Sequence, residues 1–98
     1  MERKEFAAGF DVPPGKALFL FFNYTGIDWN IDIGPNFMQA PAKQPDQVFS
    51  VTAIVIDPGS YVWQGHSPGG QYSITGDNGK KVFEFSVREG EVHEAMTQ

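Results

Sequence analysis

The chain has 98 residues, twelve of them acidic and seven basic, so its net charge is −5, and it contains no cysteine. This length fits one domain, and the lack of cysteine excludes disulfides, thiolate metal sites and a cysteine nucleophile. The basic residues are scattered, which argues against a nucleic-acid partner, and the longest apolar run, 17–22, is too short for membrane insertion.

The spacing of apolar residues predicts an all-β fold. They recur at every second position, and eleven glycines and seven prolines separate the segments. We expect a single domain over residues 1–98, a seven- to eight-stranded antiparallel Greek-key β-sandwich. The predicted strands are 5–12, 16–24, 28–33, 48–56, 61–64, 71–75, 81–87 and 91–95.

In the first half of the chain, segment 16–24 is apolar on both faces, which predicts a strand in a central position. Segment 28–33 alternates, with Trp29 in phase with two isoleucines, and predicts one buried and one wet face. Residues 34–47 hold three prolines and no periodicity, so we expect a long connection that crosses between the sheets. Within it, Phe37 and Met38 are either an anchor onto the core or a protein interface.

In the second half, Asp57-Pro58-Gly59-Ser60 is a turn signal, and 76–79 is a hairpin signal. Segment 81–87 alternates Phe83, Phe85 and Val87 inward against Glu84 and Ser86 outward. The turn at Glu89-Gly90 precedes the last short strand.

Residues 54–92, with the proline-glycine-aromatic turn 58–61, the phenylalanine-rich strand and the Glu89-Gly90 turn, resemble small prealbumin-like sandwich modules. Examples are the PEGA and carboxypeptidase-regulatory-like domains. The resemblance implies an accessory domain of a larger cell-envelope or secreted protein, with no activity and no shared functional site. Both ends of the chain are polar, as expected for an excised domain. An immunoglobulin-like strand order remains the alternative.

No catalytic residue, metal site or cofactor is expected. His66 and Ser67 are adjacent and point apart, without an elbow motif for a nucleophile. Glu91 and His93 share a strand face, but a zinc site needs more donors. Asn23-Tyr24-Thr25 matches the glycosylation pattern, which we interpret as chance.

We therefore expect a non-catalytic structural or protein-interaction domain whose partner is another protein or a second copy. The alternative is a carbohydrate-binding module that uses Tyr61, Trp63, Gln64 and His66, provided that the two aromatic rings lie on an exposed face. The direction in which Trp63 points decides between these interpretations.

Overall fold

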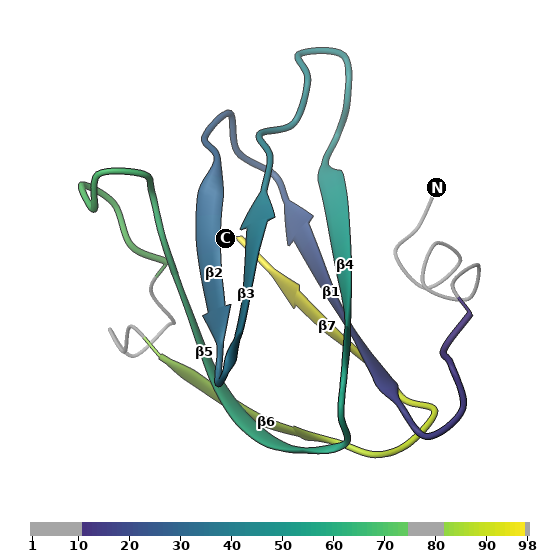
Figure 1. Cartoon of the computed structure of the whole chain (residues 1–98). Helices are drawn as coiled ribbons and strands as arrows, with labels where there is room; N and C mark the ends of the chain where they lie inside the picture. The colour runs from purple at the N-terminus through teal and green to yellow at the C-terminus, as the bar shows by residue number, and fades with distance from the viewer. Residues whose placement is uncertain (1–10, 75–81, 98) are drawn as a thin grey trace.

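A computed structural model of the chain describes residues 11–74 and 82–97, and within them it forms two β-sheets (Figure 1). The first sheet has the order β4-β1-β7 and the second the order β3-β2-β5-β6. The strands are β1 (Ala17–Asn23), β2 (Trp29–Ile33), β3 (Asn36–Ala40), β4 (Ser50–Ile56), β5 (Gly59–His66), β6 (Phe83–Val87) and β7 (Val92–Met96). The expected all-β fold with sandwich-like layers is confirmed.

Strand β1 is the centre of the three-stranded sheet, as its doubly apolar sequence predicted, and all seven of its residues are buried. Phe19 and Phe21 face the second sheet and belong to the main core. Leu18, Leu20 and Phe22 face the other way and form a separate cluster, against which Phe49, Val51, Val92 and other partly buried side chains pack. A strand covered on both faces reads as a continuous apolar run.

The pairing of β1 with β7 is parallel, whereas its pairing with β4 is antiparallel. The expectation of a wholly antiparallel sandwich was therefore wrong at this one pair. Instead of folding back beside β6, the chain turns at 88–91 and changes sheets. The turn joins β1 through hydrogen bonds from Gly90 N to Lys16 O and from Leu18 N to Glu91 O.

The proline-rich segment contains a strand, β3, that the sequence did not predict. The chain turns between Ile33 and Asn36 through Gly34 and Pro35, and Gly34 has a φ of +57°. A glycine with positive φ at the first central position is the requirement of a tight hairpin turn. The side chain of Asn36 also donates a hydrogen bond from its Nδ2 to Ile33 O at 3.2 Å. Only the rest of the expected connection, from Pro41 onward, is irregular.

Two other predicted strands are absent or lie outside the described residues. Of segment 5–12, only 11 and 12 are described, and neither is in a strand. Of segment 71–75, residues 71–74 are described, and among them Ser73 forms a single bridge with His66. The hairpin signal 76–79 lies outside the described residues.

Candidate functional site

The aromatic pair of the predicted sugar platform points into the molecule. Trp63 is only 4% exposed, and its ring contacts those of Phe19 and Phe83, with centroids 6.0 and 4.4 Å away. Tyr61 is half-buried and stacks on Phe85 at 5.5 Å. The condition for the carbohydrate platform, two aromatic rings on an exposed face, is therefore not met. The two-residue period of β5 places Tyr61, Trp63 and Gly65 on one face, and the opposing sheet covers this face through Phe19 and Phe21 of β1.

The same period turns Gln64 and His66 outward, onto the solvent face of the four-stranded sheet. Two rows of side chains cross this face, each set by the strand register. Asp32 of β2 lies between Phe37 of β3 and Gln64 of β5.

In the second row, Asn30 of β2 lies between Gln39 of β3 and His66 of β5. His66 Nδ1 and Asp32 Oδ2, which belong to different rows, are 4.0 Å apart. The two rows form what we call the polar grid: Asn30, Asp32, Phe37, Gln39, Gln64 and His66.

The predicted interface pair, Phe37 and Met38, is divided between two environments. Phe37 is 55% exposed on the grid, whereas Met38 is 7% exposed and belongs to the main core. Adjacent residues of a strand face opposite ways, so these two side chains cannot form one contact patch.

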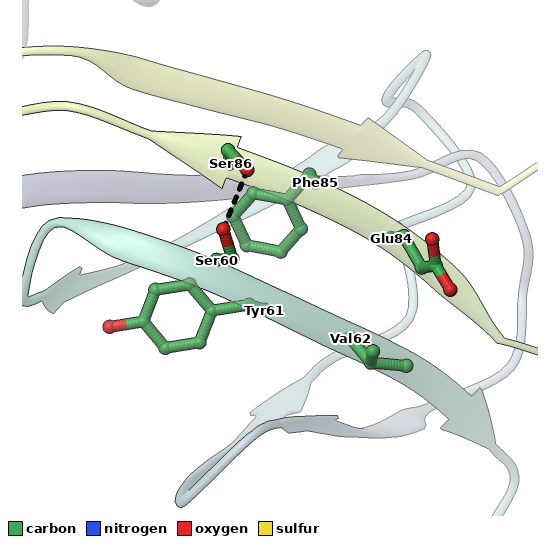
Figure 2. A pocket seen from close by; sticks show the side chains of 6 residues that line it. All are labelled: Ser60, Tyr61, Val62, Glu84, Phe85 and Ser86. Atoms are coloured by element: carbon green, nitrogen blue, oxygen red, sulfur yellow. Dashed lines mark hydrogen bonds between the residues drawn. The ribbon is translucent and has the colours of Figure 1, made fainter.

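Two shallow depressions lie on the four-stranded sheet. One, of about 440 Å³, is lined by three successive pairs of β5 and β6: Ser60–Ser86, Tyr61–Phe85 and Val62–Glu84 (Figure 2). The two serine hydroxyls are 2.9 Å apart and hydrogen-bonded. The second, of about 300 Å³, is lined by Asn30 and Gln39 of the grid together with Asp28, Trp29, Ala40, Pro41 and Pro68.

His66 and Ser67, which were considered as a nucleophile–base pair, do not contact each other through their side chains. Ser67 is buried, and its Oγ accepts a hydrogen bond from Tyr72 N at 3.0 Å within its own loop. His66 faces outward beside Asp32 instead.

His93 is half-buried between the sheets and stacks on Phe85 at 4.1 Å and on Phe19 at 5.8 Å. Burial lowers the pKa of His93 below its ordinary value, against the opposing charge of Glu94. Glu91, which was expected to share a strand face with His93, precedes β7 and accepts a hydrogen bond from Arg88 N at 2.6 Å, as part of the turn. Across the described ranges, no group of three or more histidine and acidic side chains is placed to hold a metal ion.

Asn23 of the glycosylation pattern is fully buried. Its amide nitrogen donates to Ile27 O at 2.9 Å and to Pro41 O at 3.0 Å. An amide that is buried and bonded in this way is not accessible to glycan attachment in the folded chain.

The four sheet edges differ in charge. The edges at β3 and β4 lie on the same side of the molecule, and neither strand contains a charged residue. The edges at β6 and β7 contain Glu84, and His93 with Glu94, respectively. Sequence alternation alone did not identify these edges, because strand order decides which strand is an edge.

No family model matches the chain, and no curated protein matches it. In the part of the chain that the structure describes, no helix is long and apolar enough to cross a membrane. Function must therefore follow from the chemistry of the surface itself.

Proposed function

We propose that this domain is a non-catalytic protein-interaction module, and that its contact surface is the free edge of β4. The observation that carries this proposal is that an uncharged strand with the sequence SVTAIVI forms the edge of the three-stranded sheet. It has seven residues, no charge and no proline. Within the described residues it pairs with β1 alone.

Every edge strand presents unpaired backbone groups to other strands. The β4 edge is unusual because no charged residue and no proline protects it. Proteins usually protect edges with charges, proline or short length. Strands β6 and β7 follow that rule through Glu84 and Glu94, and β3 is shorter, with five residues. An unprotected edge of high β-propensity is suited to pairing with a strand of another chain.

The partner that we infer is a second copy of the chain. Two β4 strands that pair antiparallel about Ala53 place Val51 of each copy beside Val55 of the other, because Ala53 is the middle residue of the strand. This pairing continues one three-stranded sheet into the next and is self-complementary, as a two-fold interface requires. Two copies with a net charge of −5 repel one another, so an uncharged edge is the favourable place for contact.

The charges at the end of β4 are themselves paired. Lys16 Nζ lies 2.5 Å from Asp57 Oδ1, and the hydrogen bond to Asp57 raises the pKa of Lys16. An approaching strand therefore meets a neutral pair there instead of an isolated carboxylate.

The test compares two valines of nearly equal exposure. Val55, on the edge strand, is 44% exposed, and Val62, on the interior strand β5, is 45% exposed. We expect sedimentation equilibrium up to about 1 mM protein to show dimers for wild type and Val62→Lys, and monomers for Val55→Lys. A monomeric wild type over the whole range contradicts the proposal, as does equal dissociation by both variants.

For the finer fold class, we infer a Greek-key arrangement of the prealbumin-like kind, in an accessory module of a larger cell-envelope or secreted protein. The chain changes sheets between β1 and β2, between β3 and β4, between β4 and β5, and between β6 and β7, as crossing connections of Greek keys do. The Asp57-Pro58-Gly59-Ser60 turn supports the resemblance, and the Tyr61 hydroxyl donates to Asp57 O at 2.5 Å across it.

A further inference from the structure

We propose that the outer face of the four-stranded sheet binds a neutral oligosaccharide, with Phe37 as the ring on which a sugar stacks and the polar grid as the source of hydrogen bonds. This site lies on the other sheet from β4 and is independent of the interaction through that edge. It differs from the platform expected from sequence, because Phe37 replaces Tyr61 and Trp63.

The polar side chains of the grid have unused hydrogen-bonding capacity. The side chains of Asn30, Gln39 and Gln64 make no hydrogen bond within the described part of the chain, in contrast to those of Asn23 and Asn36, which bond the backbone. Each primary amide offers two N–H donors and a carbonyl acceptor in one plane. Such a group can bind two neighbouring hydroxyls of a sugar at once.

Phe37 supplies the apolar part of the site. It is 55% exposed although Met38 and Ala40, the next inward residues of the same strand, are buried. The ring of Phe37 is therefore not part of the hydrophobic core. In the register, Asp32 and then Gln64 follow it across the sheet, and neighbouring strands lie about 4.8 Å apart. A sugar stacked on the ring by its C–H face has carboxylate and amide groups within reach of its hydroxyls.

The charge of this face selects the ligand class. It carries Asp32 and, further along, Glu84, and none of its outward side chains in the described ranges belongs to lysine or arginine. Acidic sugars and phosphates would be repelled. A neutral, hydroxyl-rich ligand accepts from the amides and donates to Asp32 without that penalty.

One of the two depressions borders the site, and strand β5 continues beyond it toward the other. The smaller one borders the grid at Asn30 and Gln39. The larger one lies along β5 from Val62 to Ser60, where the Ser60 and Ser86 hydroxyls meet (Figure 2). From His66 to Ser60 the strand covers about 20 Å at 3.3 Å per residue. This length suits several linked sugar rings better than one.

The experiment is an NMR titration of the ¹⁵N-labelled protein with neutral hexasaccharides of glucose, xylose, mannose and N-acetylglucosamine, each to about 10 mM, which saturates a site with a Kd of about 1 mM. A galacturonic acid hexamer is the charged counterpart. We expect at least one neutral sugar to shift the amides of β2, β3 and β5 around the grid, and the acidic hexamer to leave them unchanged.

Variants of Phe37 then test whether its ring is the one on which the sugar stacks. Phe37→Ala and Phe37→Leu should weaken binding roughly tenfold, whereas Phe37→Tyr should retain it. Val48→Ala, which shortens a side chain that is 75% exposed and lies outside the grid and outside β4, is the control and should bind as wild type. The proposal is overturned if no neutral sugar shifts the grid, if the acidic hexamer binds as well as the neutral ones, or if Phe37→Ala binds unchanged.

Discussion

Replacing the buried Asn23 by alanine tests whether one side chain holds the end of β1 to two loops. Its Nδ2 bonds the carbonyls of Ile27 and Pro41. Its Oδ1 accepts from Thr25 N at 2.9 Å and from the Thr25 hydroxyl at 2.7 Å. At about 1 kcal/mol of net stabilisation for each hydrogen bond, the four together give about 4 kcal/mol.

The loss should be somewhat smaller than this sum, because three of the groups left behind keep other partners. Ile27 O still accepts from the Thr25 hydroxyl at 3.3 Å. Pro41 O still accepts from the Ser50 hydroxyl at 2.6 Å. The Thr25 hydroxyl still accepts from Trp29 Nε1 at 3.0 Å. We therefore expect Asn23→Ala to lower the free energy of unfolding by about 2–4 kcal/mol.

Urea unfolding followed by tryptophan fluorescence measures this change as a lower midpoint at constant slope. In a thermal scan the melting temperature should fall by at least about 10 °C. The matched control is Asn36→Ala, which removes one hydrogen bond from a half-buried side chain and should cost about 1 kcal/mol or less. A loss for Asn23→Ala no larger than that of the control would refute the reasoning.

Three further predictions concern the core. Trp63→Ala should cost about 3–5 kcal/mol in urea unfolding; a loss below about 1 kcal/mol would contradict its burial. Gly65→Ala should cost about 1–3 kcal/mol, because the added Cβ would lie 2.6 Å from Ile74 Cδ1; unchanged stability would show that Ile74 moves away freely. The lowered pKa of His93 means that the unfolded chain binds its proton more readily. The contribution of neutral His93 to the free energy of unfolding should therefore be complete above pH 6.5, the ordinary pKa of histidine. It should decline as the pH falls below that value toward the lower pKa of His93 in the folded chain. His93→Phe should remove this part of the pH dependence. If the free energy of unfolding of the variant changes with pH between pH 5 and 7.5 in the same way as that of wild type, the prediction is refuted.

The sequence predicted those strands whose side chains alternate or cluster strongly. Trp29, Ile31 and Ile33 are buried as their period indicated, and β1 is central as its run of apolar residues indicated. Here the local pattern suffices, because a buried face needs apolar side chains wherever the strand lies. Strand β3 was missed because NFMQA has weak contrast between its faces, so its pairing with β2 depends on the turn at Gly34.

The candidate site depended much more on tertiary structure. In β5, Val62 separates Tyr61 from Trp63, so both faces of the strand contain apolar side chains and the sequence does not tell which one is inward. The opposing sheet decides this, because Phe19 and Phe21 of β1 contact the ring of Trp63 from that sheet.

The sequence by itself determined the all-β class, the strands with strong alternation or a continuous apolar run, and the acidic, cysteine-free composition, because these follow from local spacing and composition. Only the tertiary structure decided that β7 joins β1 in parallel, that β4 is an edge, and that Phe37, Asp32 and Gln64 form one row. These features depend on register between strands that are distant in the chain. A shift of one residue in register would turn every side chain of a strand to the opposite face.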